Sequence, residues 1–447
     1  MSFNNLPQNP LGNLESLAEL LIDERTGILQ KVEEIARNAG DPDFFQFSGT
    51  ACNTQAFVRE ENFGNTGGAS IRREVALAKA IGEGVERYCS AIFDVEDLPL
   101  CSQRDADFPT ADPASFNLFS EEQYQQPGFQ WVPFTPDTPV RWTPTLDMQT
   151  RKTVWVPGAM VFIPYFFYQG SGDAPILQPI STGLACHGSF EQAAIGGICE
   201  VIERDAFTIT WQAKMSRPQI RVETLSDENY DLVNRFERNG SKVVLLDLSM
   251  DHGVPTVLSV LRGQSENSPA LVFAASSDPN PETAVRKALE ELAHTRRYSY
   301  QLKISMEPVV PDPPEHGNIH SQVDHLLYYT NYENARQCDF IFASKDRINF
   351  SDLPDLSTGD SKKDLEILLE RIYSTGEKVF LADVTSPDVS SLGLTVVRAI
   401  IPGYHPLRMG FGVRSLGGKR LWEIPQKLGF PGIRRETGDV GIPHPYP

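Results

Sequence analysis

The feature of this sequence most suited to chemistry is a short acidic motif that occurs twice. The two copies are residues 83–87 (EGVER) and residues 200–204 (EVIER). Residues three apart lie on one face of a helix, so Glu83 projects with Glu86, and Glu200 with Glu203. Both pairs stand beside apolar neighbours, where like charges repel and lose hydration unless a cation offsets them. The motif therefore predicts carboxylates gathered around a positive charge.

Magnesium is a cation that suits four such carboxylates. It takes hard oxygen ligands and commonly bridges the phosphates of a bound substrate. Arg87 and Arg204, which end the two motifs, could hold phosphate oxygens or the carboxylates themselves. The plainer alternative is two charged helix faces whose arginines pair with neighbouring glutamates, since such pairs are common. Two copies in apolar surroundings, each preceded by a turn containing Gly or Ser, favour the metal site.

Two long helices must position these motifs. Apolar residues at helical spacing predict one helix from about Ser70 to Ser90, with Ser70 as its N-cap, and another from about Phe190 to Trp211. Further helices are predicted at 281–300 and near 363–375. Extended apolar runs predict strands at 243–248, 255–261, 270–275, 339–343, 379–383 and 395–401. The expected fold class is mixed α/β (α+β), with helices packed on β-sheets.

The other segments are less regular. Residues 13–38 show helical spacing that is interrupted at 23–27, which predicts two short helices. Residues 104–150 are rich in Pro, Asp, Phe, Gln and Thr without a clear period. We expect them to form a long excursion with short strands, at the surface rather than in the core. The run 152–166 predicts a strand bent at Pro157-Gly158.

Composition and motif content exclude several classes of protein. The chain has 447 residues, of which 59 are acidic and 40 basic, and its net charge of -19 disfavours nucleic acid as a partner. The sequence has no apolar run long enough for a membrane span, no secretory signal pattern, no P-loop and no HExxH motif. The six cysteines lack metal-binding spacing, so we expect reduced thiols in a cytoplasmic protein. His316, His320 and His325 are expected to be solvated.

Together these motifs resemble the YcaO family, and in particular its azoline-forming cyclodehydratases that act as stand-alone proteins in thiazole/oxazole-modified microcin biosynthesis. The resemblance covers roughly residues 60–447. It is carried by residues 67–88 (GGASIRREVALAKAIGEGVERY), 181–193 (STGLACHGSFEQA), 200–205 (EVIERD), 284–296 (AVRKALEELAHTR) and 443–447 (PHPYP). It divides the chain into an N-terminal helical segment, 1–60, and a YcaO domain, 61–447.

The resemblance implies an ATP-binding fold with ATP and Mg²⁺ as cofactors. Such an enzyme phosphorylates a backbone amide oxygen in a ribosomally made precursor peptide. A Cys, Ser or Thr side chain attacks the amide carbon, and loss of phosphate leaves a thiazoline or (methyl)oxazoline ring. By position, the metal ligands are Glu83, Glu86, Glu200 and Glu203. The implied nucleotide-binding residues are Arg73, Lys79, Arg87, Ser181, Gln192, Arg204, Arg286 and Arg296.

The C-terminal prolines are a further candidate for the active site. Alternating prolines favour an extended polyproline segment that loses little entropy on ordering, whereas chain ends are ordinarily frayed. The resemblance implies instead that Pro443, Pro445 and Pro447 reach the active site and contribute to catalysis. We therefore expect deletion of residues 443–447 to abolish ring formation and leave the fold intact.

The resemblance also bears on partners. About sixty residues precede the first matching block, too few for the E1-like, leader-binding region of fused cyclodehydratases, so we expect a separate partner that recruits the precursor peptide. A flavin dehydrogenase in the same pathway and a homodimer are further possibilities. Two other functions stay open: formation of a thioamide by attack of external sulfide, which the PHPYP ending disfavours, and a non-catalytic scaffold, which the retention of all four glutamates disfavours.

Overall fold

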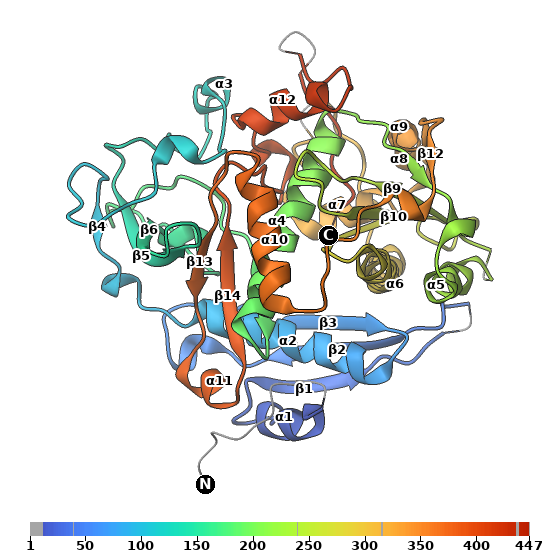
Figure 1. Ribbon diagram of the computed structural model, residues 1–447, viewed down its shortest axis with the longest axis horizontal. Helices are drawn as coiled ribbons and strands as arrows, with labels where there is room; N and C mark the ends of the chain where they lie inside the picture. The colour runs from blue at the N-terminus through green and yellow to red at the C-terminus, as the bar shows by residue number, and fades with distance from the viewer. Residues whose placement is uncertain (1–11, 39, 239, 314–315, 435–437, 447) are drawn as a thin grey trace.

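The structure is a computed structural model that describes residues 12–38, 40–238, 240–313, 316–434 and 438–446. Three sheets are arranged around the long helix α4 (Phe190–Gln212), which runs through the centre of the view in Figure 1. This architecture confirms the expectation of a mixed α/β fold with helices packed on sheets.

The N-terminal sheet supports the first acidic helix. Strands β1 (Leu29–Glu34), β2 (Phe45–Ala51) and β3 (Asn65–Ser70) pair antiparallel in that order. Helix α2 (Arg73–Ala91) packs on β2 and β3, and α1 (Leu14–Leu21) packs beside it. The sheet therefore joins residues on both sides of the boundary expected at residue 60.

Two sequence predictions in this region are wrong. The second short helix expected before residue 38 is strand β1, an edge strand in which only Leu29 is fully buried. Ser70 does not cap α2; it ends β3, and its hydroxyl donates a hydrogen bond of 2.5 Å to the Glu290 carboxylate. Helix α2 begins at Arg73.

The second sheet has five strands in the order β11-β10-β9-β8-β12. Their bounds are β8 (Gln219–Ile220), β9 (Lys242–Asp247), β10 (Thr256–Arg262), β11 (Leu271–Ser277) and β12 (Arg347–Ile348). Helix α6 (Pro281–Ser305) packs against β10 and β11, and α5 (Asp227–Glu237) packs against α6 and β9. Three predicted strands and the helix with proline in its first turn are confirmed here.

The third sheet follows the order β4-β5-β13-β14-β7, with β6 paired to β5. Its bounds are β4 (Leu100–Cys101), β5 (Val140–Asp147), β6 (Thr153–Pro157), β7 (Leu184–His187), β13 (Phe380–Asp383) and β14 (Thr395–Ile400). Helix α4 packs on β14 and β7, and α10 (Ser361–Tyr373) packs on α4. The predicted strands near 379 and 395 and the helix near 363 are confirmed.

The structure corrects three further predictions. The segment 104–150 contributes β5 and a buried aromatic and aliphatic cluster that includes Phe119 and Trp142, so part of it belongs to the core. The strand expected at 339–343 is a short helix, α9 (Asp339–Phe342). The strand predicted from 152 ends at Pro157, where a 3₁₀ turn begins.

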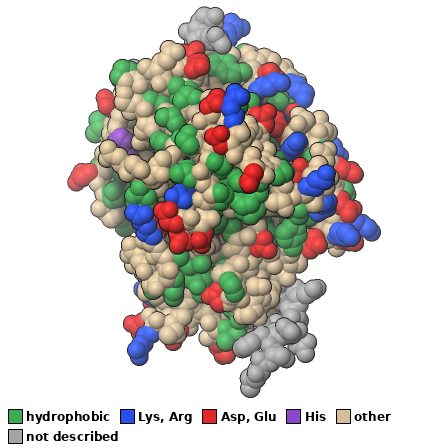
Figure 2. Space-filling view, turned by 90° about the vertical axis from the view of Figure 1, so that its left-hand side faces the viewer, with side chains coloured by type: hydrophobic (Ala, Val, Ile, Leu, Met, Phe, Trp, Pro, Cys, Tyr) green, Lys and Arg blue, Asp and Glu red, His purple; other side chains and the backbone are tan. Residues whose placement is uncertain are grey.

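Of the remaining helices, α12 has nine residues and the others are shorter. They are α3 (Glu121–Tyr124), α7 (Gln322–Tyr328), α8 (Tyr332–Ala335), α11 (Pro387–Ser391) and α12 (Lys419–Lys427). All six cysteines are free thiols. Acidic and basic side chains are interspersed on the face drawn in Figure 2. Within the described ranges, no helix is long and apolar enough to cross a membrane.

Candidate functional site

The two acidic helices meet at one cavity of about 290 Å³. Glu83 and Glu86 reach it from α2, Glu200 reaches it from α4, and Glu291 reaches it from α6. Because α2 contacts β7 and α4 packs on the same strand, the fold brings together motifs more than a hundred residues apart. Of the four predicted metal ligands, Glu83, Glu86 and Glu200 line this cavity and Glu203 does not, and their role as ligands stays a prediction.

Three of the acids are held by backbone N–H groups of strands or the turns before them. The bonds run from Gly67 to Glu83 (2.8 Å), from Cys186 to Glu86 (2.7 Å) and from Gly183 to Glu200 (2.9 Å). Gly183 has a φ of 92°, which L residues rarely adopt, and a Cβ there would lie 2.3 Å from the Ala399 oxygen. The glycines thus place donors where the carboxylates need them.

Burial raises the pKa values of two motif glutamates, and neighbouring charges modify this rise. Burial raises the pKa of Glu86 to about 8; the Cys186 hydrogen bond opposes this rise, and the charges of Glu83 and Glu200 add to it. Burial also raises the pKa of Glu203 to about 7, although the Arg204 charge lowers it. Both carboxyls hold protons more tightly than an exposed glutamate, so a cation bound in the cavity would favour their ionised forms.

The two motif arginines line the same cavity. Arg87 pairs with Glu83 at 3.2 Å, and Arg204 lies 3.5 Å from both Glu200 and Glu203. Pairing with neighbouring glutamates is thus present in this structure, as the plainer alternative expected. The pairs face a cavity rather than open solvent, where guanidinium groups can also contact phosphate oxygens.

The donor set suits Mg²⁺ together with phosphate oxygens. Among the described residues, no three Asp, Glu, His or Cys side chains are close enough to hold a metal ion by themselves. Mg²⁺ is commonly bound through one or two carboxylates while substrate phosphates and waters complete its coordination. Glu83, Glu86, Glu200 and Glu291 supply hard oxygen ligands around a cavity with space for such phosphates.

The other expected nucleotide contacts differ in whether they line this cavity. Ser181 lines it. Lys79 does not; its ammonium group donates to the Glu290 carboxylate at 2.6 Å and to the Ala69 carbonyl at 3.1 Å. Gln192 lies at the start of α4, where its side chain accepts a bond from Ser189.

The three remaining arginines also lie outside the lining. Arg73 is exposed and pairs with Glu34 at 2.7 Å. Arg296 pairs with Asp41 at 2.8 Å, and Arg286 is exposed on α6. The cavity therefore unites Arg87, Arg204 and Ser181, and a nucleotide-binding role stays a prediction for these residues as for the five that lie outside its lining.

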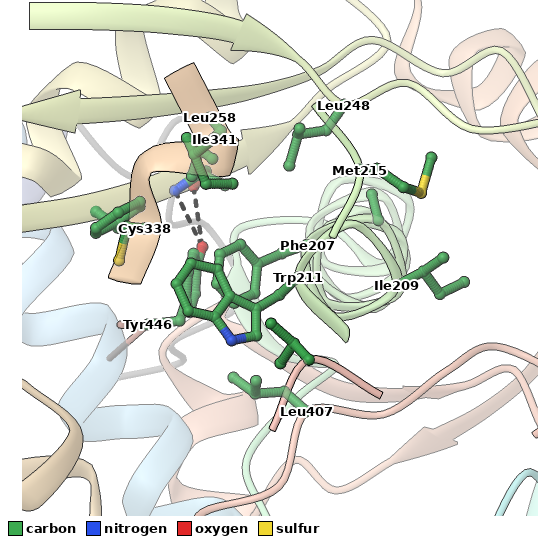
Figure 3. Packing of buried hydrophobic residues seen from close by; sticks show 14 of the residues in the cluster. Phe207, Ile209, Trp211, Met215, Leu248, Leu258, Cys338, Ile341, Leu407 and Tyr446 are labelled. Carbon is green, nitrogen blue, oxygen red and sulfur yellow. Dashed lines mark hydrogen bonds between the residues drawn. The ribbon is translucent and has the colours of Figure 1, made fainter. Parts of the chain in front are cut away.

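The C-terminal tail enters the core beside the second motif. Pro443 and Pro445 are buried, and Pro447 lies outside the described residues. The Tyr446 hydroxyl donates a hydrogen bond to Glu203, and its ring lies 4.4 Å from the Arg204 guanidinium carbon. Figure 3 shows Tyr446 packed beside Phe207 and Trp211, with its hydroxyl bonded to the backbone of β11.

This packing corrects the expectation that deleting the tail leaves the fold intact. Tyr446 is only 1% exposed and belongs to the largest buried cluster, and the Pro443 carbonyl accepts a bond from Tyr329. Deletion of residues 443–447 would remove this aromatic side chain from the core, and large truncations of buried aromatics are strongly destabilising. The role of the tail at the site is therefore better tested by a substitution that removes a single atom than by deletion of the whole segment.

Sequence reasoning missed several residues near the site. Glu291 follows Glu290 in the matching block 284–296, so its position in that block was the available signal. Tyr446, which lies between two of the C-terminal prolines, was not predicted as a site residue. His325 was expected in solvent but is buried, and its ring stacks on that of His444 with centroids 3.8 Å apart. His316 is also buried, whereas His320 is exposed.

The comparison with protein families identifies the fold. A model of the YcaO family, described as an ATP- and Mg²⁺-binding cyclodehydratase, matches residues 67–405. The match covers more than half of the chain, so this protein belongs to the YcaO family. The resemblance seen in the sequence is confirmed, and ATP and Mg²⁺ are the cofactors that this family uses.

Solved structures share the fold at low sequence identity. A heterocyclase in complex with substrate and cofactor has a TM-score of 0.77 and 20% identity, and covers 98% of this chain. The present chain spans 57% of that heterocyclase. YcaO from Methanopyrus kandleri, bound with AMPPCP and Mg²⁺, has a TM-score of 0.65 and 21% identity, with coverage of 93% of this chain and 95% of that one.

A third match belongs to a multiprotein complex. A chain of the E. coli microcin synthetase McbBCD complex with pro-MccB17 bound has a TM-score of 0.57 and 15% identity. The match covers 92% of this chain and 96% of that chain. These likenesses support the YcaO-type fold.

The protonation of Glu86 predicts a pH-dependent stability. Between its ordinary pKa of 4.5 and about 8, the folded state holds a proton that the unfolded chain has released. The free energy of unfolding should therefore fall as pH rises through this range in metal-free buffer. Denaturation curves from pH 5 to 9 should show a shallower fall for Glu86→Gln than for the unmodified chain.

Glu74→Gln is the control for this measurement, because Glu74 is exposed on the same helix and its pKa is lowered by hydrogen bonds from its own backbone and Arg72. It should leave the slope above pH 5 unchanged. Identical slopes for Glu86→Gln and the unmodified chain would contradict the assignment of the raised pKa to Glu86.

Proposed function

We propose that this protein is an ATP-dependent cyclodehydratase that forms thiazoline or (methyl)oxazoline rings in a ribosomally made peptide. The observation that carries the proposal is the single cavity shared by the two ExxER helices, which joins Glu83, Glu86 and Glu200 with Arg87 and Arg204. Membership of a family described as ATP- and Mg²⁺-binding cyclodehydratases supports the same reaction.

The chain's own groups have distinct tasks in this reaction. When bound, Mg²⁺-ATP supplies the phosphoryl group that makes the amide oxygen a leaving group. The glutamates of α2 and α4 hold the cation, and Arg87 and Arg204 offset negative charge on the phosphates. Tyr446 hydrogen-bonds Glu203 and packs on Arg204, so it positions two groups of the second motif.

We also propose that the chain works with a separate protein that binds the leader of the precursor peptide. Support comes from the fold match to a microcin synthetase that is a complex of several proteins with its peptide bound. A flavin dehydrogenase acting on the azoline product would belong to the same pathway.

The reaction is tested by the mass of a peptide. The precursor encoded nearest to this protein is incubated with the chain, its leader-binding partner and Mg²⁺-ATP. We expect loss of one water for each modified Cys, Ser or Thr. Exchange of oxygen for sulfur when sulfide is present would instead identify a thioamide-forming enzyme and would refute cyclodehydration.

Glutamate variants test the cavity itself. Glu83→Gln and Glu200→Gln each remove one negative charge with little change in shape, and we expect kcat/KM to fall by about 100-fold, the order seen when a group that stabilises transferred charge is lost. The control is Glu74→Gln, which alters an exposed glutamate of the same helix. Equal activity in all variants would exclude this cavity as the active site. ATP binding with an affinity that does not depend on Mg²⁺ would indicate a non-catalytic scaffold.

The tail is tested by removing one oxygen atom. Tyr446→Phe keeps the buried ring but removes the hydrogen bond to Glu203, together with those to the backbone of Ala275. A hydrogen bond to a charged group contributes about 1.5 kcal/mol, so activity should fall roughly tenfold. Circular dichroism and the melting temperature report the fold; unchanged kcat and KM in the folded variant would contradict a positioning role.

A further inference from the structure

A second cavity, of about 100 Å³, adjoins the acidic one. The two cavities share Ile180, Thr182 and Arg204 in their walls. The second wall is mostly apolar, but it also contains the side chains of Arg398, on β14, and Arg408, which follows that strand. Each of these arginines is only 5% exposed. Two buried guanidinium groups thus lie next to the site where phosphate chemistry is proposed.

Neither guanidinium is in salt-bridge contact with a carboxylate of the described residues, and the nearby charge of Glu200 offsets only part of the burial of Arg398. Arg398 donates to the carbonyls of Met160 (3.1 Å) and Ile180 (2.7 Å), and Arg408 donates to that of Gln178 (2.6 Å). Among the described residues, Nη1 of Arg398 and Nε of Arg408 have no hydrogen-bond partner, and neither arginine forms an ion pair.

This arrangement is electrostatically incomplete. Burying a charge without a counter-charge is costly, and carbonyl oxygens offset only part of that cost. Burial lowers the pKa of both Arg398 and Arg408 to about 10; the charge of Glu200 opposes this fall for Arg398, whereas the charge of Arg408 adds to it. A small anion in the cavity would place negative charge beside both guanidinium groups, whose forks match the oxygens of phosphate and carboxylate groups.

We propose that this second cavity is an oxyanion site that receives the inorganic phosphate released in the acidic cavity. The inference rests on the proposed function. As the azoline forms, the sulfur or oxygen of the Cys, Ser or Thr side chain bonds to the amide carbon and gives up its proton to water. The C–O bond of the phosphorylated amide then breaks, its electron pair leaves with phosphate, and the amide nitrogen gives its proton to water as the C=N bond forms. Arg204 lies in the walls of both cavities, so phosphate can pass from one set of cationic groups to the next.

The size of the cavity favours a free oxyanion over a larger ligand. Sites for small molecules commonly measure roughly 300–1,000 Å³, whereas this one measures about 100 Å³. A phosphate dianion carries enough charge to balance both arginines. A carboxylate of the peptide shares the oxyanion chemistry but carries a single charge. Comparing the binding of phosphate with that of acetate therefore distinguishes inorganic phosphate from a peptide carboxylate.

The test is a titration of inorganic phosphate into the full chain with saturating ADP and Mg²⁺, so that the nucleotide site is occupied. Calorimetry should detect one phosphate site, and Arg398→Gln and Arg408→Gln should each weaken it at least tenfold. Arg217→Gln is the matched control: Arg217 is also buried and also donates to carbonyls, those of Asp247 (3.0 Å) and Ser249 (2.7 Å), but it lines neither cavity. It should change phosphate affinity less than twofold.

Several outcomes would overturn the proposal. They are unchanged phosphate affinity in both variants, an equal loss in Arg217→Gln, or binding of acetate but not phosphate, which would indicate a peptide carboxylate. Arg398→Lys keeps the charge but removes the fork, and it provides a folded comparison if the glutamine variant is unstable. The phosphate titration needs no peptide. If the chain failed to form rings in the peptide assay, the measured phosphate affinities would therefore keep the same interpretation.

Discussion

Repulsion among carboxylates that share one small cavity is the constraint on which the rest of the structure depends. Glutamates from α2 and α4 line this cavity together, and α6 adds another. Backbone N–H groups from Gly67, Gly183 and Cys186 fix three of them in place. The sheets therefore do more than support the helices, because their edges supply the donors that keep the acids together until a cation arrives.

The chain's last residues extend this arrangement into the core. Tyr446 joins β11 to Glu203 and Arg204, so the second motif is held from a strand, a helix and the tail at once. On the other side, Arg204 borders the cavity of Arg398 and Arg408. Acidic and basic cavities thus meet at one guanidinium, which suits a reaction that handles Mg²⁺ and phosphate in succession.

Sequence reasoning predicted the strongly periodic elements and the site they carry. Helix α4 was expected at 190–211 because its apolar spacing persists over six turns, and the repeated motif identified three of the four cavity glutamates. Strand β1 was mistaken for a helix because it is an edge strand with a single buried side chain, which leaves no two-residue alternation. Helix α9 is too short to show any period. Glu291 and Tyr446 reach the site only through tertiary packing, which spacing along the chain does not encode.

The most direct test of this account is the position of the metal. Crystals grown with Mn²⁺ in place of Mg²⁺ and a non-hydrolysable ATP analogue would give an anomalous difference peak for the ion. The account predicts a peak in the acidic cavity, ligated by phosphate oxygens and by carboxylates from both α2 and α4. A strongest peak outside this cavity, or nucleotide bound there without metal, would contradict it.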